Sequence, residues 1–493
     1  MASGLLVAGT TSDAGKSLVT AGICRWLART GVSVAPFKAQ NMSNNSMVCP
    51  DGSEIGRAQW LQAKACGVLP EAAMNPVLLK PGSDRRSHVV LMGRPWGSLE
   101  AGEWATGRRA LAEAAFAAFD DLSTRCDVVV AEGAGSPAEI NLRAGDYVNM
   151  GLARAKDLPV VVVGDIDRGG VLAAMFGTLG LLEPQDQAHL RGWIVNKFRG
   201  DLDLLRPGLG MLEERTGRPV LGVLPFLTEV WLDSEDALAL SGWHRRGARD
   251  PGSPSRTTLD VAVVRLPRIS NATDVDALAA EPGVRVNVTA SPDAVAEADL
   301  AVLPGTRATL SDLGWLRDRG LAAALVERGR RGRPVLGICG GYQMLGRELV
   351  DTQGVEAPEP ARVSGLGLLP TEVTFGRDKQ LGTPQGSWGG HAVTAYEIHH
   401  GVARWSADAD GTQPFLDGVQ QGRVWGTMWH GAFENDDFRR GFLVEVAGGA
   451  GSSWRPEPGA PGFGERREVM LDRLADAVEE HLDTAALLAL MGL

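Results

Sequence analysis

Short apolar runs alternate with longer amphipathic stretches along the first half of the chain. Several of these runs are uninterrupted Val, Ile and Leu, which is typical of parallel strands that are buried on both faces. The stretches at residues 16–30 and 99–122 have helical spacing. The pattern predicts a doubly wound parallel sheet, whose ligands gather at the carboxyl ends of its strands. The expected strands are residues 4–8, 32–37, 128–131, 160–164, 192–196 and 220–224.

A second alternating series follows a stretch that is rich in Pro, Gly, Ser and Arg, which we interpret as a linker. Its expected strands are residues 259–266, 284–288, 300–303 and 335–338. Near the C-terminus, Met470, Leu471, Leu474, Val478 and Leu482 lie on one face of an expected helix, which is typical of a packing surface. The sequence therefore predicts an α/β protein with two doubly wound domains. The expected segments are a first domain at 1–243, a linker at 244–258, a second domain at 259–447, and a flexible stretch with a helix at 448–493.

Length, net charge and cysteine spacing exclude several classes of function. A chain of 493 residues is too long for one core, which agrees with two or three domains. The net charge of −11 argues against nucleic acid or an anionic membrane surface as the main partner. The five cysteines form no CxxC pair, and no zinc-ligand spacing occurs. With no expected signal peptide and no apolar stretch of membrane length, we expect a cytoplasmic protein.

A glycine-rich loop follows the first expected strand. Backbone N–H groups of such a loop cradle phosphates, its lysine neutralises them, and its final hydroxyl can bind Mg²⁺. Five residues, not the usual four, separate the two glycines. The alternative is a chance glycine turn, but a strand precedes the loop and a helical stretch follows it. The sequence predicts an ATP site made of Gly9, Thr10, Thr11, Ser12, Asp13, Ala14, Gly15, Lys16 and Ser17.

Two strand ends add candidates for the same site. Glu132 follows a buried strand, and its carboxylate can hold Mg²⁺ opposite Ser17. The alternative is a solvated acid at the end of a strand. Asn196 ends another strand, where its amide can read a base edge of ATP or can close an Asx turn.

The segment at residues 37–46 is rich in amide and hydroxyl side chains. Burying it in a core would cost free energy, and a plain surface loop would not need so many amides. Lys38 is a candidate for phosphate contacts, and the amides and hydroxyls after it can recognise a substrate that carries carboxylates or amides. A second polar segment follows the strand at 160–164 and offers metal, substrate or intermediate contacts. The alternative for each is loop capping. The candidates are Gln40, Asn41, Ser43, Asn44 and Asn45 in the first segment, and Asp165, Asp167 and Arg168 in the second.

Cys339 stands where an apolar run stops at Gly-Ile-Cys-Gly-Gly. A strand, a tight turn and a helix start would hold the sulfur at a strained elbow, where N–H groups of the helix face it. That environment suits a nucleophile better than a buried structural cysteine. The N–H of Gly305 or Thr306, with that of Gly340, can form an oxyanion hole.

The base that a thiol nucleophile needs has three candidates, His399, His400 and His430. We favour His430, because it follows an apolar strand and precedes a glycine, so its ring can sit exposed at a strand end. The alternative is a histidine that is satisfied within the core or a loop.

Together these segments resemble the cobyric acid synthase family, glutamine-hydrolysing, from about residue 4 to about residue 440. The marks are Gly-Thr-Thr-Ser-Asp-Ala-Gly-Lys-Ser, Phe-Lys-Ala-Gln-Asn-Met-Ser-Asn-Asn-Ser, Gly-Ile-Cys-Gly-Gly-Tyr-Gln and Tyr-Glu-Ile-His. The first half resembles dethiobiotin synthetase, a P-loop-type parallel sheet. The second half resembles a class I glutamine amidotransferase domain, which is flavodoxin-like.

The resemblance implies an amidoligase of cobalamin biosynthesis. It would amidate the b, d, e and g carboxylates of adenosylcobyrinic acid a,c-diamide, using ATP, Mg²⁺ and ammonia from L-glutamine. Tyr342 and Gln343 would help to hold the glutamine, and a shielded route would carry the ammonia. Ordinary class I amidotransferases carry His-x-Glu, whereas here Ala432 stands in the place of the Glu, so what orients His430 is left open.

Two alternative functions fit parts of this pattern. One is cobyrinic acid a,c-diamide synthase, which has a similar phosphate-loop half, although the segment at 37–46 favours the later step. The other is a nucleotide-switch ATPase of the partitioning type with an inactive glutaminase-like domain. The intact set of Cys339, Gly340, Gln343 and His430 argues against it.

Overall fold

The computed structural model describes residues 3–81, 86–100, 104–230, 257–357, 359–405 and 411–493. These residues divide into two compact units. The first unit holds residues 3–43, 49–230 and 467–493, and the second holds residues 44–48 and 257–466. Most of the expected linker, residues 244–256, lies outside the described residues.

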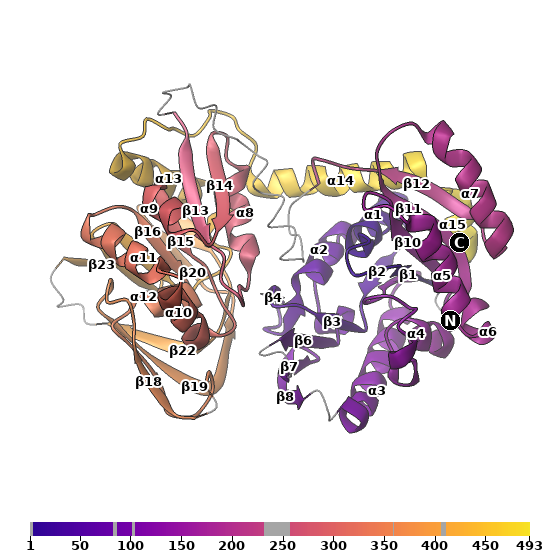
Figure 1. The fold of residues 1–493 in the computed structure, drawn as a ribbon, viewed down its shortest axis with the longest axis horizontal. Helices are drawn as coiled ribbons and strands as arrows, with labels where there is room; N and C mark the ends of the chain where they lie inside the picture. The colour runs from indigo at the N-terminus through magenta and orange to yellow at the C-terminus, as the bar shows by residue number, and fades with distance from the viewer. Residues whose placement is uncertain (1–2, 82–85, 101–103, 231–256, 358, 406–410) are drawn as a thin grey trace. The chain divides into compact units, whose positions relative to one another are not determined.

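A six-stranded parallel sheet forms the centre of the first unit (Figure 1). Buried Val, Ile and Leu residues predominate in most of its strands, and every neighbouring pair is parallel. The strand order reverses beside the first strand, as in other sheets of this kind. All six strands expected from the sequence are present. In spatial order they are β12 (Val220–Pro225), β11 (Leu190–Phe198), β10 (Val160–Asp165), β1 (Ser3–Gly9), β9 (Val128–Glu132) and β2 (Val34–Phe37).

The helix expected at residues 99–122 begins later than predicted. The observed helix is α3 (Trp104–Ser123), and residue 99 belongs to strand β8 (Arg94–Glu100). The turn before β8 has φ angles of 47° at Met92 and 73° at Gly93. Positive φ at both central residues matches a two-residue hairpin, so hairpin pairing overrides the helical pattern here. The hairpin belongs to a small sheet ordered β3 (Gln40–Met42), β6 (Val77–Pro81), β7 (Arg86–Leu91) and β8.

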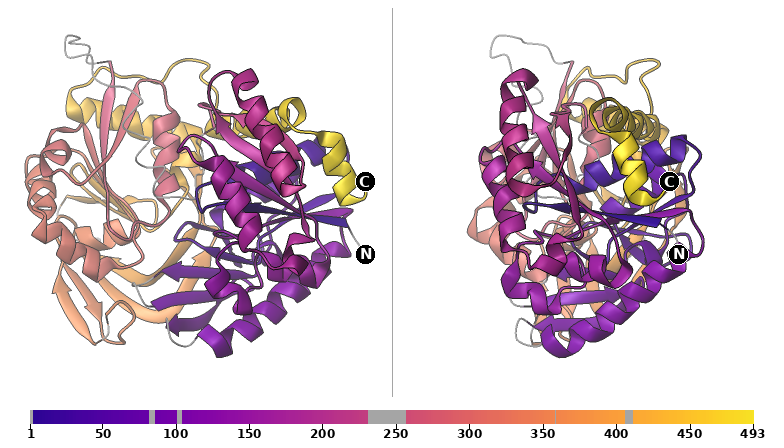
Figure 2. Two further views of the ribbon diagram at one scale, coloured as in Figure 1. Left: turned by 45° about the vertical axis from the view of Figure 1, so that its right-hand side comes forward. Right: turned by 90° about the vertical axis from the view of Figure 1, so that its right-hand side faces the viewer.

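Helices complete the first unit. α1 (Lys16–Arg29) follows the phosphate loop, and α2 (Arg57–Cys66) packs against it. α15 (Thr484–Met491) contacts β1, so the two chain ends lie side by side (Figure 2). The remaining helices are α4 (Met150–Lys156), α5 (Val171–Leu181), α6 (Pro184–Gln187) and α7 (Leu202–Thr216).

Four of the five residues of the apolar face predicted near the C-terminus lie on helix α14 (Phe463–His481), and Leu482 directly follows it; all five are buried. Gly22 of α1 permits a close approach, because a Cβ there would lie 3.0 Å from the Leu474 carbonyl oxygen. Ion pairs flank this contact, with Arg25 2.9 Å from Asp472 and Arg29 2.6 Å from Asp476. This part of the C-terminal segment therefore packs into the first unit.

The second unit is built on a seven-stranded sheet. Its first five strands are parallel, and they include the four that the sequence predicts. The last two strands are antiparallel. The order is β14 (Val284–Thr289), β13 (Leu259–Val264), β15 (Leu300–Leu303), β16 (Val335–Ile338), β25 (Val424–Thr427), β24 (Gly418–Gln421) and β23 (Thr412–Phe415).

Two further sheets of the second unit have no strong apolar runs and were not predicted. One is a mixed sheet ordered β18 (Ala361–Ser364), β17 (Glu348–Asp351), β19 (Thr371–Gly382) and β22 (Glu397–Trp405). Another is the hairpin of β20 (Gln385–Trp388) and β21 (His391–Thr394). Helix α13 (Asp436–Ala450) includes residues 448–450, which were expected to begin a flexible stretch. The other helices are α8 (Asp276–Ala280), α9 (Pro292–Glu297), α10 (Thr309–Asp318), α11 (Leu321–Arg330) and α12 (Gly340–Leu345).

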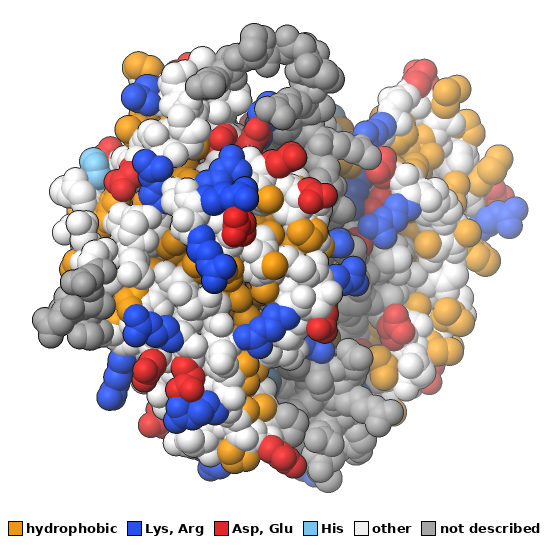
Figure 3. Space-filling view, turned by 60° about the vertical axis from the view of Figure 1, so that its left-hand side comes forward, with side chains coloured by type: hydrophobic (Ala, Val, Ile, Leu, Met, Phe, Trp, Pro, Cys, Tyr) orange, Lys and Arg blue, Asp and Glu red, His pale blue; other side chains and the backbone are white. Residues whose placement is uncertain are grey.

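Two surface properties bear on partners. On the face drawn in Figure 3, basic and acidic side chains are interspersed. Among the described residues, no helix combines the length and the hydropathy needed to cross a bilayer.

Arg328 of α11 ties three segments of the second unit together, and it is only 2% exposed. Burial lowers the pKa of Arg328 to about 10, and the neighbouring Arg333 adds to the shift, so the group is still charged at neutral pH. Its guanidinium donates only to backbone carbonyls, at the end of α9 and the start of β16. The acceptors are the oxygens of Val295 (2.9 Å), Ala296 (2.9 Å), Ala298 (2.8 Å), Asp299 (3.2 Å) and Pro334 (2.9 Å).

We expect Arg328→Met to destabilise the second unit by about 3 kcal/mol, because it leaves buried carbonyls without donors. Arg331→Met is the matched control, since Arg331 is 70% exposed and its ion pair with Glu327 contributes under about 1 kcal/mol. The measurement is the urea midpoint followed by tryptophan fluorescence. Equal midpoints for the two variants would show that the carbonyl contacts of Arg328 do not stabilise the fold.

Candidate active site

The phosphate loop closes around its own lysine. β1 ends at Gly9 and α1 begins at Lys16, whose Nζ donates to the carbonyl oxygens of Thr11 (2.8 Å), Ser12 (3.2 Å) and Gly135 (3.1 Å). Gly15 has a φ of 91°, and a Cβ there would lie 2.2 Å from Asn196 Nδ2, so only glycine fits. The loop thus carries a buried cation beside backbone amides, the environment that a phosphate needs.

Asn196 supports this loop directly. Its Nδ2 donates to the Ala14 carbonyl oxygen at 2.9 Å, and its Oδ1 accepts from the Lys197 N–H at 2.9 Å. Lys197, which sequence reasoning did not select, donates to the Asp13 carbonyl (2.7 Å) and to Asp165 Oδ2 (2.7 Å). Its φ of 61° at a strand end is a feature that only the structure shows. The amide of Asn196 therefore positions the loop, and base reading by it stays a prediction.

Glu132 is fully buried at the end of β9 and accepts from several donors. Its Oε1 lies 2.8 Å from Ser17 Oγ and 2.8 Å from Lys38 Nζ, and its Oε2 lies 2.6 Å from Gln62 Nε2. Burial alone raises the pKa of Glu132, but the Lys38 charge and the hydrogen bonds from Lys38, Gln62 and Ser17 outweigh it and lower the pKa. The group is therefore a carboxylate, next to the hydroxyl with which it was expected to share Mg²⁺.

The other polar candidates are divided between the two units. Asp165 accepts from the Asp167 N–H at 2.9 Å, and Arg168 lies 2.8 Å from Asp13 of the phosphate loop. In the first polar segment, Gln40 accepts from the Tyr147 hydroxyl at 2.5 Å, and Asn41 donates to Gln59 at 3.0 Å. Asn44 instead belongs to the second unit, with residues 44–48. Within the described ranges, no group of three or more His, Cys, Asp or Glu side chains forms a metal cluster by itself.

Cys339 occupies the predicted elbow between β16 and α12. Its backbone angles are φ 49° and ψ −111°, a strained conformation for a side chain with a Cβ. Its N–H donates to the Thr427 carbonyl at 2.8 Å, which holds the turn against β25. The loop after β15 approaches closely, because a Cβ on Gly340 would lie 2.7 Å from Thr306 Cγ2. The structure therefore brings the three expected oxyanion-hole residues, Gly305, Thr306 and Gly340, to the elbow.

His430 is held by a buried carboxylate that the sequence did not reveal. Its Nδ1 lies 2.6 Å from Asp274 Oδ2, and the Gly431 N–H donates to Asp274 Oδ1 at 2.9 Å. The two side chains are 1% and 3% exposed. Burial alone lowers the pKa of His430, but the Asp274 charge, followed by the Cys339 sulfur and the hydrogen bonds to both residues, raises it to about 10. Cys339, His430 and Asp274 thus lie next to one another in the order that a nucleophile, its base and an orienting acid would need.

A short turn positions Asp274 within η4 (Ala272–Val275). Asn271 before it has a φ of 50°, and its Oδ1 accepts from the Ser46 N–H at 2.9 Å. The Ala272 N–H donates to Asn45 Oδ1 at 3.2 Å. Residues 44–48 therefore fix the turn that carries Asp274. The sequence gives no signal for Asp274, which lies 156 residues before His430.

The other residues predicted to belong to the thiol site differ in their surroundings. Tyr342 is 1% exposed, and its ring packs in the core against Gly426, while its expected contact with glutamine stays a prediction. Gln343 is buried too, and its Oε1 accepts from Thr309 Oγ1 at 3.1 Å. His399 and His400 each place Nδ1 near a backbone carbonyl, of Gly401 (2.9 Å) and Gly376 (3.2 Å).

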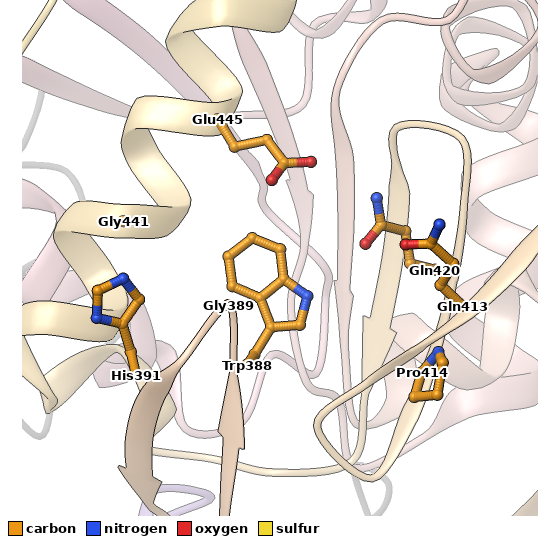
Figure 4. Close-up of a pocket in the computed structure, with 8 residues that line it drawn as sticks. All are labelled: Trp388, Gly389, His391, Gln413, Pro414, Gln420, Gly441 and Glu445. Atoms are coloured by element: carbon orange, nitrogen blue, oxygen red, sulfur yellow. The ribbon is translucent and has the colours of Figure 1, made fainter.

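A separate pocket of about 540 Å³ lies in the second unit (Figure 4). The Trp388 ring lies beneath Glu445 of α13, and the carboxamides of Gln413 and Gln420 lie across from it. None of the residues expected from the sequence to take part in chemistry lines this pocket.

Comparison with known proteins gives the same two-part organisation. Residues 5–238 match the CobQ/CobB/MinD/ParA nucleotide binding domain, and residues 260–438 match the CobB/CobQ-like glutamine amidotransferase domain. Cobyric acid synthase of Cutibacterium acnes is 61% identical over 489 residues, which cover 99% of both chains. Cobyric acid synthase of Mycolicibacterium gilvum is 62% identical over 492 residues, which cover 99% of this chain and 96% of that one. With a phosphate loop in one unit and a cysteine elbow in the other, the chain belongs to the cobyric acid synthase family.

Proposed function

We propose that this ligase of cobalamin biosynthesis amidates the b, d, e and g carboxylates of adenosylcobyrinic acid a,c-diamide. ATP would phosphorylate each carboxylate, giving ADP and an acyl phosphate. Ammonia from glutamine would then displace phosphate and leave an amide. The observation that carries the proposal is the arrangement of Cys339, His430 and Asp274. A thiol, a base and an orienting acid in this order can release ammonia from the side-chain amide of glutamine.

In the second unit, Cys339 as thiolate attacks the side-chain amide carbon of glutamine. The oxyanion that forms is bound by N–H groups of the loop after β15 and of Gly340. Protonated His430 gives its proton to the departing ammonia, and Asp274 holds the ring in the right tautomer. Water then hydrolyses the thioester, with neutral His430 as the base, and glutamate leaves.

In the first unit, Lys16 and the loop amides bind the ATP phosphates. Ser17 and Glu132 lie together and fit Mg²⁺, since carboxylate and hydroxyl oxygens are ligands that it prefers. When bound there, the ion supplies positive charge that offsets the charge developing on the phosphates. Lys38 and the polar segment after it are proposed to contact the phosphates or the corrinoid.

Labelled glutamine tests the proposal as a whole. With Mg-ATP, the corrinoid and amide-¹⁵N-glutamine, mass spectrometry should find up to four labelled nitrogens per product. Cys339→Ala should incorporate none from glutamine but should still amidate from ammonium chloride, because only the nucleophile is lost. Cys126→Ala, at a half-buried thiol of the first unit, is the matched control and should behave as wild type.

The negative outcomes separate the alternatives. Amidation of cobyrinic acid at its a and c carboxylates would indicate the a,c-diamide synthase instead. ATP turnover that is indifferent to glutamine and corrinoid would indicate a nucleotide switch. Glutamine use by Cys339→Ala at the wild-type rate would contradict the nucleophile assignment.

Asp274→Asn should lower kcat for glutamine hydrolysis about 100- to 10,000-fold, because the ring loses its orienting carboxylate. The same change removes the charge that raises the pKa of His430, so the pKa falls from about 10 toward its ordinary 6.5. Protonated His430 is the acid that the reaction needs, so the alkaline limb of the pH–rate profile should move to lower pH. An unshifted limb would show that Asp274 does not set the protonation of His430.

Lys16→Met should abolish amidation from both glutamine and ammonium chloride, because the phosphates lose their buried cation. Glutamine hydrolysis by the second unit should persist. Lys64→Met, at an exposed lysine of α2, is the control. Product analysis and glutamate release, measured on the same samples, distinguish the two activities. Normal amidation by Lys16→Met would show that ATP binds elsewhere.

A further inference from the structure

The residues from Tyr396 to Gly401 run along one side of the cysteine elbow. The Tyr396 and His430 backbones pair through bonds of 2.8 and 3.0 Å, and their rings stack at 5.4 Å. Cys339 Sγ lies 3.9 Å from the Ile398 carbonyl oxygen. A Cβ on Gly401 would lie 2.6 Å from Gln343 Nε2, so this residue also lies against the helix after the cysteine. Three contacts therefore place the start of β22 beside the nucleophile.

His399 lies within this segment, and one of its ring nitrogens has no hydrogen bond. Its Nδ1 is 2.9 Å from the Gly401 carbonyl, which can only accept, so Nδ1 carries the hydrogen. In the neutral ring, Nε2 then presents a lone pair. The side chain is only 9% exposed, and Nε2 has no hydrogen-bond partner among the described residues. Buried polar atoms are rarely left unpaired, so this atom calls for a ligand.

Two acids flank the ring of His399. Glu397 Oε2 lies 3.5 Å from Nε2, and the Glu397 side chain is 30% exposed. On the other side, burial raises the pKa of Asp417, while hydrogen bonds from Thr427 and Met428 oppose the rise. Asp417 also accepts a hydrogen bond from Thr427 Oγ1. The carbonyl oxygen of the same Thr427 accepts from the Cys339 N–H, so Asp417 is connected to the elbow. The groups around the free nitrogen are therefore acceptors, which suit a cation that donates hydrogen bonds.

We propose that His399 Nε2 and the Glu397 carboxylate bind the α-ammonium group of glutamine while Cys339 attacks its side-chain amide. The inference rests on the proposed glutaminase activity and names the residues that recognise its substrate. Only three carbon atoms separate the ammonium nitrogen of glutamine from the amide carbon, so both ends must be held close to the sulfur. A metal is a poorer occupant, because the described residues form no metal-binding group here.

His399→Asn tests this with little disturbance, since the Asn amide keeps a donor for the Gly401 carbonyl and removes Nε2. Hydrolysis is measured for glutamine and for glutaramate, which lacks the α-amino group. We expect kcat/KM for glutamine to fall about 10- to 100-fold, the effect of losing a hydrogen bond to a charged group. The kcat/KM for glutaramate should be unchanged, so the preference for glutamine collapses. Glu397→Gln, a second and partly exposed position, should act in the same direction.

His400→Asn is the matched control, because it makes the same change one residue further along β22. It should keep the wild-type preference for glutamine over glutaramate. Amidation from ammonium chloride, measured on each variant, reports that the chain is folded and that the first unit is active.

An equal loss on both substrates would give His399 a purely structural role and overturn the proposal, as would no loss at all. If His399→Asn instead loses its discrimination against 4-aminobutanamide, which lacks the α-carboxylate, the histidine binds that carboxylate and the proposal is wrong. If the wild-type enzyme and Cys339→Ala release glutamate equally, the proposed glutaminase itself fails.

Discussion

The buried hydrogen bond between His430 and Asp274 is the constraint on which the chemistry of the second unit depends. A charge on either side chain has almost no access to water, so each needs the other, and removing one would leave an unpaired buried charge. The carboxylate must therefore be placed accurately. The turn around Asn271 and Ala272 does this, and it is itself fixed by Asn45 and Ser46. That explains why such a polar segment of the sequence is buried.

The first unit also holds a buried carboxylate that needs partners, that of Glu132. This buried carboxylate is stable because Lys38, Ser17 and Gln62 all donate to it, and together they outweigh the cost of desolvation. Both sites lie where parallel strands end. Gly9 and Glu132 end adjacent strands of one sheet, and Cys339 follows a central strand of the other. Carboxyl ends of parallel strands leave loops and helix starts free to carry function.

Local features were predictable from the sequence, and long-range ones were not. The central strands are continuous Val runs, and glycine spacing marks both Gly9–Ser17 and Cys339, so these were found. Asp274 could not be found, because its role depends on a contact across 156 residues. The β7–β8 hairpin depends on a left-handed Met92, which no propensity suggests. Tyr342 resembled a ligand-binding residue beside Cys339, but its position on α12 turns its ring into the core.

The carboxylate that contacts His430 comes from a distant part of the sequence and not from the residues after it. The resemblance to class I amidotransferases leads one to expect a glutamate two residues after His430, but Ala432 stands there and is 1% exposed. The carboxylate beside His430 is instead that of Asp274, in the turn after β13. It also accepts from the N–H of Gly431, which has a φ of 71°. The residues that hold this turn closely follow Lys38, the partner of Glu132, in the sequence. One short stretch of chain therefore contributes to the buried carboxylate networks around Glu132 and around Asp274.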